Sequence, residues 1–183
     1  MAVNDLRRGM SIMLNGAIHK VVEFQHVKPG KGGAFVRTKL KKVESGAVVD
    51  HTFRSSEKVE QAVLTEKPME YIYKDADNLY FMDNRTYEQT AVPAGDVDGA
   101  DILPENATVT FVMHEEEIVD VILPDSVELT VTETDPGVRG DTAQGGSKPA
   151  TTSTGFVVQV PLFIQKGEKI MVNTSTGKYL GRG

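Results

Sequence analysis

The stretch that decides the fold reads AIHKVVEFQHV-KPGKGGA-FVRTKLKKV and occupies residues 17–43. Its first part is rich in β-branched residues, and its last part alternates apolar and basic side chains, which is typical of two strands. The loop between them contains one proline and three glycines, Pro29, Gly30, Gly32 and Gly33. Such residues make the chain reverse its direction. The pattern therefore predicts a long β-hairpin with Lys31 at its tip.

The second strand of this hairpin has two different faces. One face carries Val36, Thr38 and Leu40, and the opposite face carries Phe35, Arg37, Lys39 and Lys41. Lys28 and Lys42 lie beside these residues in the sequence. Basic side chains around an aromatic ring suit an RNA backbone with a stacking contact. A strand edge that carries lysines to prevent aggregation is the competing interpretation.

Lys31 itself allows two interpretations. Glycines on both sides remove bulk around its ammonium, so the tip could enter a narrow polyanionic cavity. A lysine in a glycine-rich loop also keeps an ordinary hairpin soluble. A nucleotide-binding loop is excluded, because Gly32 follows Lys31 where that motif needs Ser or Thr.

The net charge of −6 conceals an uneven distribution. Residues 1–63 hold 11 Lys/Arg and 6 Asp/Glu, residues 64–126 hold 3 and 15, and residues 127–183 hold 6 and 5. The basic first third can contact phosphates, while the acidic middle limits indiscriminate binding to nucleic acid. An ordinary solvated surface with uneven charge is the alternative.

Cysteine usage and hydropathy indicate the compartment. The sequence contains no cysteine, which excludes disulfides, thiolate metal sites and thiol nucleophiles. Its beginning lacks the apolar core of a secretory signal, and no apolar run approaches the roughly 20 residues of a membrane span. We therefore expect a cytoplasmic protein that does not enter a membrane.

Short strand-like runs recur along the chain and helical patterns are scarce, which predicts an all-β protein of three small β-barrels. We expect these barrels to cover residues 1–63, 64–126 and 127–183. Predicted strands after the hairpin lie at 48–53, 69–73, 79–82, 107–113, 118–123, 126–134 and 156–160. Residues 93–104 suit one short helix or a functional loop, and a Gly/Ser/Thr-rich stretch runs on to Gly155.

Catalytic and metal-binding patterns are weak. The run His114–Glu117 has no second histidine at the spacing of a zinc helix. Three aspartates between Asp96 and Asp101 lie in a glycine-rich loop, but the glycine and glutamate of a calcium loop are misplaced. We expect no catalytic residues, no metal and no cofactor.

Several stretches together resemble bacterial elongation factor P over essentially the full length. The first two are Asn4–Met10 at the start and Lys28–Leu40 at the hairpin. The most specific block is Lys148-Pro149-Ala150, Gly155, Val158, Val160-Pro161, Ile164 and Gly167. Upstream of it, Asp135-Pro136-Gly137 and Gly140-Asp141-Thr142 match as well.

The resemblance implies three β-barrels in an L shape, an SH3-like first domain followed by two barrels of the oligonucleotide-binding (OB) type. It further implies a non-enzymatic monomer that binds the 70S ribosome between the peptidyl and exit sites. There it would contact ribosomal RNA and the P-site peptidyl-tRNA, and promote peptide-bond formation at consecutive prolines. Bracing a poorly held peptidyl-tRNA lowers the entropic part of the barrier without covalent chemistry by the protein.

By the same resemblance, Lys31 is the tip residue that approaches the acceptor end of the tRNA and often carries an enzymatic extension. This implies a Lys31-modifying enzyme as a partner. An unmodified lysine reaches only ~6 Å beyond its backbone. β-Lysylation, an aminopentanol-type extension and no modification all stay open, although the flank looks more like the aminopentanol branch.

The remaining implied contacts lie in two domains. In the first domain the residues that face tRNA would be Lys28, Arg37, Lys39, Lys41 and Lys42. In the last domain the residues that lie toward the small subunit would be Arg139, Lys148, Tyr179 and Arg182. The loop Gly95–Leu103 departs from the family pattern in spacing and lacks its aromatic residue, which puts a messenger-RNA contact there in doubt.

Other functions remain as alternatives. A general RNA-binding or chaperone module would bind loose single strands, whereas a translation factor would prefer ribosomes with an empty exit site. An enzyme would show substrate-dependent turnover. A specialised paralogue with other stalling targets is a finer alternative.

Overall fold

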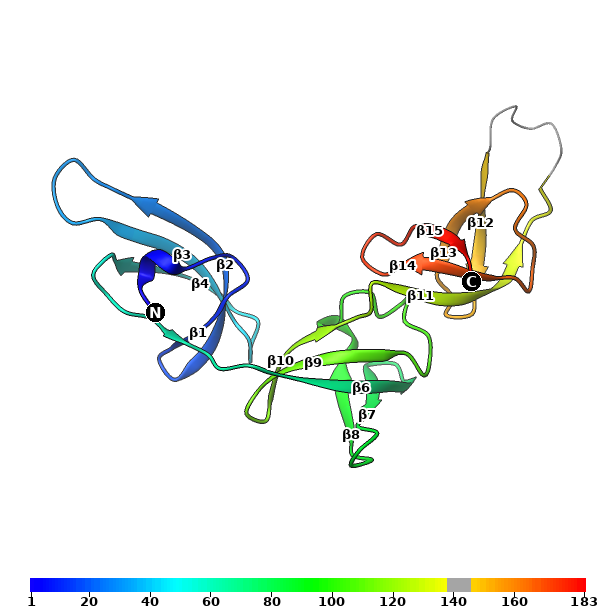
Figure 1. Ribbon diagram of the computed structural model, residues 1–183, viewed down its shortest axis with the longest axis horizontal. Helices are drawn as coiled ribbons and strands as arrows, with labels where there is room; N and C mark the ends of the chain where they lie inside the picture. Colours follow the sequence, from blue (N-terminus) through cyan, green and yellow to red (C-terminus); the bar gives the residue numbers. More distant parts are fainter. Residues whose placement is uncertain (138–145) are drawn as a thin grey trace. The chain divides into compact units, whose positions relative to one another are not determined.

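The computed structural model describes residues 1–137 and 146–183, which form three five-stranded β-sheets (Figure 1). Within these ranges helix is limited to two short 3-10 turns, η1 (Val3–Asp5) and η2 (Ala94–Asp96). No helix of the described chain has the length and apolar character needed to cross a bilayer. The prediction of an all-β protein is confirmed.

Packing divides the chain into two compact units. The first unit contains residues 1–65 and 114–119, and the second contains residues 66–113 and 120–183. The division into domains at residues 63/64 and 126/127 stays a prediction.

The first sheet is built around the predicted hairpin and has the strand order β4-β3-β2-β1-β5. Its strands are β1 (Ser11–Leu14), β2 (Ala17–Val27), β3 (Phe35–Lys42), β4 (Val48–Arg54) and β5 (Glu60–Gln61). Side chains from four strands and the adjoining segments form its core, namely Val3, Leu6, Ile12, Val21, Val36, Leu40, Phe53 and Val59. The predicted apolar face of β3 is therefore the face that the core buries.

The second sheet has the order β10-β9-β6-β7-β8. Its strands are β6 (Thr65–Lys74), β7 (Asn78–Met82), β8 (Gln89–Pro93), β9 (Thr108–His114) and β10 (Glu117–Ile122). Its core is aromatic, because the ring of Phe81 lies edge-on to Phe111 at 5.1 Å and 5.6 Å from Tyr71, centroid to centroid. Strand β8 is not among the predicted strands. Val92 is its one buried side chain, so its sequence shows no alternation of apolar and polar residues.

The third sheet has the order β13-β12-β11-β14-β15. Its strands are β11 (Ser126–Thr134), β12 (Ser147–Thr152), β13 (Val157–Pro161), β14 (Lys169–Asn173) and β15 (Tyr179–Arg182). Strand β12 lies in the Gly/Ser/Thr-rich stretch, outside the predicted strands, and pairs with both β11 and β13. Small or polar residues fill its inward positions, Lys148, Ala150 and Thr152, so the strand lacks the apolar alternation of a predictable one.

Gly137 gives a physical reason for the motif Asp135-Pro136-Gly137 just after β11. A Cβ atom at this position would overlap the carbonyl oxygen of Leu162 and lie 3.1 Å from the Cβ of Leu162. The backbone that follows β11 therefore passes directly against the backbone that follows β13. Only a residue without a side chain allows so close an approach.

We predict that Gly137→Ala lowers the free energy of unfolding of the second unit by about 1–3 kcal/mol, the usual cost of overpacking. Urea unfolding followed by circular dichroism measures this change. Gly181→Ala is the matched control, because a Cβ there would meet no atom within 4 Å. Equal unfolding midpoints for the two variants would contradict the close approach.

Candidate nucleic-acid interface

The β2–β3 hairpin presents Lys31 at an exposed tip. The two strands pair antiparallel up to the partners Val27 and Phe35, and the loop between them extends beyond the other strands of its sheet (Figure 1). At the base of this loop the Ser55 N–H donates to the Ala34 carbonyl oxygen at 3.0 Å. Within the described ranges the Lys31 ammonium has no ion-pair or hydrogen-bond partner. The charge is therefore free to meet a ligand.

The glycines keep this tip slim. Gly32 has a φ of +101°, a conformation that favours glycine. A Cβ at Gly30, Gly32 or Gly33 would meet no protein atom within 4 Å, so the loop is open on its sides. Pro29 and Lys28 are exposed as well. The predicted hairpin and its predicted tip are confirmed.

The outward face of β3 carries the predicted row of basic side chains, and the strand register shows what surrounds each of them. Arg37 lies between Gln25 of β2 and Thr52 of β4, and its guanidinium carbon is 5.5 Å from the ring centroid of Phe35. Its immediate cross-strand neighbours are thus uncharged. A guanidinium over an aromatic ring is well placed to contact both phosphate and base.

Lys39 has different surroundings, because its cross-strand partners are two carboxylates. Glu23 is its partner on β2 and Asp50 is its partner on β4. The Lys39 ammonium lies 3.9 Å from the Glu23 carboxylate, and both side chains are more than half exposed. A hollow of about 680 Å³ on this face is lined by these residues and by Arg37. The positive charge at Lys39 is therefore partly compensated, and the charge at Arg37 is not compensated by its partners.

The two remaining lysines of the row differ from each other. Lys41 is exposed and has Lys20 as its partner on β2, so two like charges lie opposite each other. Lys42 is half-buried, and its ammonium lies 3.5 Å from the Glu44 carboxylate. Strand alternation directs Lys42 away from the face that carries Lys41.

Arg54 is a residue that our sequence interpretation missed. It is exposed at the end of β4 and is the cross-strand partner of Phe35, so it adds a guanidinium at the base of the loop. The alternation of β4 could have indicated it, because Arg54 falls on the same face as Asp50 and Thr52. The sequence pattern does not show that β4 pairs with β3, and this pairing is what brings Arg54 beside Phe35.

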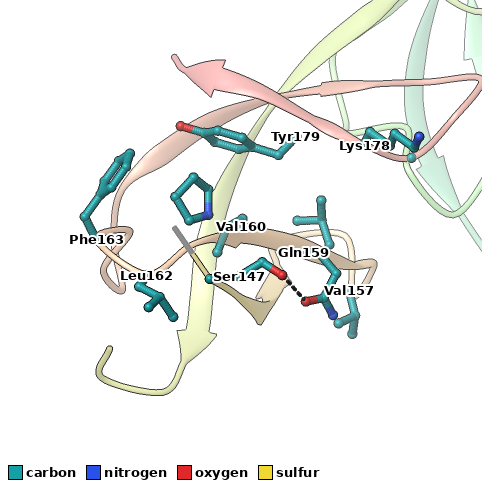
Figure 2. A pocket seen from close by; sticks show the side chains of 12 residues that line it. Ser147, Val157, Gln159, Val160, Leu162, Phe163, Lys178 and Tyr179 are labelled. Carbon is teal, nitrogen blue, oxygen red and sulfur yellow. Dashed lines mark hydrogen bonds between the residues drawn. The ribbon is translucent and has the colours of Figure 1, made fainter. Parts of the chain in front are cut away.

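In the third sheet, Tyr179 and Arg182 lie on β15, and Tyr179 lines an apolar hollow of about 890 Å³. Figure 2 shows the rings of Tyr179 and Phe163 at this hollow, with the Ser147 hydroxyl donating to Gln159 Oε1 at 3.3 Å. The Arg182 guanidinium lies 4.8 Å from the ring centroid of Phe163 and 3.7 Å from the Glu168 carboxylate. An exposed aromatic ring and a cation thus occur together here as well.

Lys148 and Arg139 complete the predicted set. Lys148 is only 7% exposed, and its ammonium donates a hydrogen bond to the carbonyl oxygen of Asp135, so it joins β12 to the end of β11. Its ammonium is thus engaged within its own sheet. Arg139 lies outside the described residues.

The loop Gly95–Leu103 is held by its apolar side chains. Val97, Ile102 and Leu103 are each at most 5% exposed. A Cβ at Gly99 would lie 3.1 Å from Leu123 Cδ2, so the loop packs closely against the segment after β10. Packing of this kind is what positions the loop.

Within the described ranges, no group of three or more His, Asp or Glu side chains is arranged to hold a metal ion. The run His114–Glu117 forms the turn of the β9–β10 hairpin, with Glu115 at a φ of +53°. It is the acidic turn that its composition indicates.

Three family matches cover nearly the whole chain. Residues 2–59 match the elongation factor P (EF-P) KOW-like domain, residues 64–121 match the EF-P OB domain, and residues 127–182 match the family described as elongation factor P, C-terminal. The predicted fold, with an SH3-like barrel before OB-type barrels, agrees with these matches.

Two relatives and one solved structure extend the comparison. Elongation factor P of Acidothermus cellulolyticus is 54% identical over 180 residues, which cover 98% of this chain and 96% of the relative. Elongation factor P of Trichodesmium erythraeum is 53% identical over 180 residues, with coverage of 98% and 97%. Eukaryotic translation initiation factor 5A from Methanococcus jannaschii has a TM-score of 0.52 at 24% identity, covers 67% of this chain and 94% of its own, and supports the fold alone.

The exposed lysine tip, the basic hairpin face and the order of the three matched domains lead to the same assignment as the two relatives, which share more than half of their residues with this chain. The chain belongs to the elongation factor P family of translation factors.

Proposed function

We propose that this translation factor binds the 70S ribosome beside the P-site peptidyl-tRNA and promotes peptide-bond formation at consecutive prolines. The observation that carries the proposal is the exposed Lys31 ammonium at the tip of the β2–β3 hairpin. The projecting part of this arm is slim enough to enter a crevice in RNA, because beyond the last β3–β4 pair, Phe35 with Arg54, only the glycine-rich loop of residues 28–34 remains. Strand β2 contains 11 residues and so spans roughly 36 Å at about 3.3 Å per residue.

This arm would act by holding the peptidyl-tRNA in position. Proline is a hindered nucleophile, and a poorly held peptidyl-tRNA spends little time in a reactive geometry. A cation that binds the phosphates of the acceptor end restricts its motion, which lowers the entropic part of the barrier. The proposal assigns no covalent step to the protein itself.

The outward face of β3 supports a contact between the hairpin and tRNA. Arg37 and Arg54 offer guanidinium groups below the base of the loop, and Lys28 and Lys41 offer exposed ammonium groups on either side of them. Phosphate contacts by such side chains provide register and affinity without reading sequence. Lys39 would contribute less because of Glu23 and Asp50, and Lys42 is already paired with Glu44.

Two further parts of the proposal concern partners. Tyr179 and Arg182 would contact ribosomal RNA from the third sheet, where the Arg182 guanidinium lies by the exposed ring of Phe163, although Glu168 partly compensates its charge. A modifying enzyme would extend Lys31, whose open, glycine-flanked loop gives such an enzyme access. An appendage with a terminal amine or hydroxyl group would place a hydrogen bond deeper among the phosphates than the lysine alone.

We predict that Lys31→Ala abolishes most of the rescue of a triple-proline reporter in reconstituted translation, because the tip cation is lost. Folding should stay within ±0.5 kcal/mol of wild type, as is usual for an exposed loop position. Lys58→Ala, a change at another exposed lysine of the first unit, is the matched control and should rescue like wild type. Equal rescue by Lys31→Ala would remove the tip from the mechanism. No rescue by recombinant wild type, followed by rescue with protein from the native host, would show that Lys31 needs its modification.

A second prediction concerns the neighbours of the basic row. Arg37→Gln should weaken ribosome binding more than Lys39→Gln, because Lys39 is partly neutralised by Glu23. The slope of log affinity against log salt should fall by roughly one for Arg37→Gln, as expected for the loss of one phosphate contact. Binding measured from 50 to 200 mM salt would test this, with Glu23→Gln expected to tighten binding. A larger loss for Lys39→Gln, or no tightening by Glu23→Gln, would contradict the compensation.

A further inference from the structure

A pair of stacked tyrosines lies on the outer face of the second sheet, in a part of the protein that the proposed function does not use. Tyr73 near the end of β6 and Tyr80 in β7 are cross-strand partners. Their ring centroids are 4.4 Å apart and their planes differ by 10°. Tyr73 is 43% exposed, whereas Tyr71 and Phe81 on the inner face are buried. One face of the sheet thus offers an aromatic surface to solvent.

The pair is held rigidly by the turn between β6 and β7. The Tyr80 hydroxyl donates to Asp75 Oδ2 at 2.7 Å. The other oxygen of Asp75 accepts the backbone N–H groups of Asp77 at 2.9 Å and Asn78 at 2.8 Å. These hydrogen bonds, above all the one from Tyr80, hold the pKa of Asp75 below its usual value, so the carboxylate is charged at neutral pH. The bond to Asp75 also raises the pKa of Tyr80, which therefore stays a hydroxyl donor.

The part of the sequence that contains this pair is acidic. Residues 64–126 carry 3 basic and 15 acidic side chains. Lys67 is paired with Asp83 at 3.1 Å. Lys74 is the cross-strand partner of the buried Leu79, so strand alternation directs it away from the face of Tyr73. The carboxylate of Asp75 contacts the pair directly, because it accepts the hydrogen bond of the Tyr80 hydroxyl.

We propose that Tyr73 and Tyr80 form a docking site for the guanidinium or ammonium group of a basic segment in a protein partner. A cation over the face of a tyrosine is attracted by the ring quadrupole. A carboxylate that accepts the phenolic hydrogen bond adds electron density to the ring and so strengthens this attraction. The excess of acidic side chains in residues 64–126 would attract the remaining basic residues of the segment.

Charge decides between this occupant and a nucleic acid. Nucleobases also stack on exposed aromatic rings in OB-type barrels. Their phosphates, however, would face the excess of carboxylates in residues 64–126, with few cations to neutralise them. The inference does not rest on the proposed function, since the Lys31 arm belongs to the other compact unit.

The test is an NMR titration. The full-length protein carries labelled tyrosine rings, and a short peptide of alternating arginine and glycine is added to it. The Tyr73 and Tyr80 signals should shift on binding, and Tyr73→Leu should weaken the affinity by about three-fold, the size of one exposed cation–π contact. Tyr87→Leu is the matched control, because Tyr87 is 74% exposed and lies outside the pair. This control should bind the peptide like wild type.

Four results would overturn the proposal. The first two are the absence of peptide binding and equal affinities for wild type and Tyr73→Leu. The third is an equal loss of affinity in Tyr87→Leu, which would mean that the loss is not specific to the stacked pair. The fourth is a stronger response of the Tyr73 and Tyr80 signals to an oligouridine of the same length, which would make the pair a nucleobase platform. Unchanged spectra for the rest of the second unit in Tyr73→Leu would show that the variant remains folded.

Discussion

The antiparallel register between β2 and β3 is the constraint on which the rest of the first unit depends. It places Val36 and Leu40 in the core and therefore turns Arg37 and Lys39 outward. A shift of one residue would exchange the two faces and bury the basic row. The same pairing extends to the base of the loop, so the strands that fill the core also carry Lys31 away from it. Core packing and the projection of the tip thus have one cause.

The same register determines how far neighbouring groups compensate the charge of each basic residue. Cross-strand neighbours surround Arg37 with uncharged groups and surround Lys39 with carboxylates, although both residues look alike in the sequence. The protein also separates charge on a larger scale, with a basic first third and an acidic middle third. Aromatic rings in these two parts differ accordingly. Phe35 in the first third lies under a guanidinium, whereas Tyr80 in the middle third donates a hydrogen bond to a carboxylate. Surfaces of opposite sign suit partners of opposite charge.

The sequence predicts those features that depend on local alternation and turn residues. The hairpin, the two faces of β3 and strand β11 follow from such patterns and agree with the structure. Strand β12 could not be predicted, because its buried residues are small or polar and gain their burial from β11 and β13. The burial of Lys148 depends on a carbonyl oxygen 13 residues away. The environment of Lys39 and the stacking of Tyr73 on Tyr80 depend on pairing partners, which a single strand pattern does not identify.

The central claim is that Lys31 reaches the acceptor end of the P-site tRNA. Because the chain contains no cysteine, Lys31→Cys provides one unique site for an iron chelate that generates hydroxyl radicals. Cleavage would be mapped on tRNA and ribosomal RNA in ribosomes stalled at consecutive prolines, with the chelate at the exposed Lys178 as a control. The account predicts strong cleavage at the acceptor end of the P-site tRNA from position 31 and none there from position 178. Cleavage from position 31 that spares the acceptor end would contradict it.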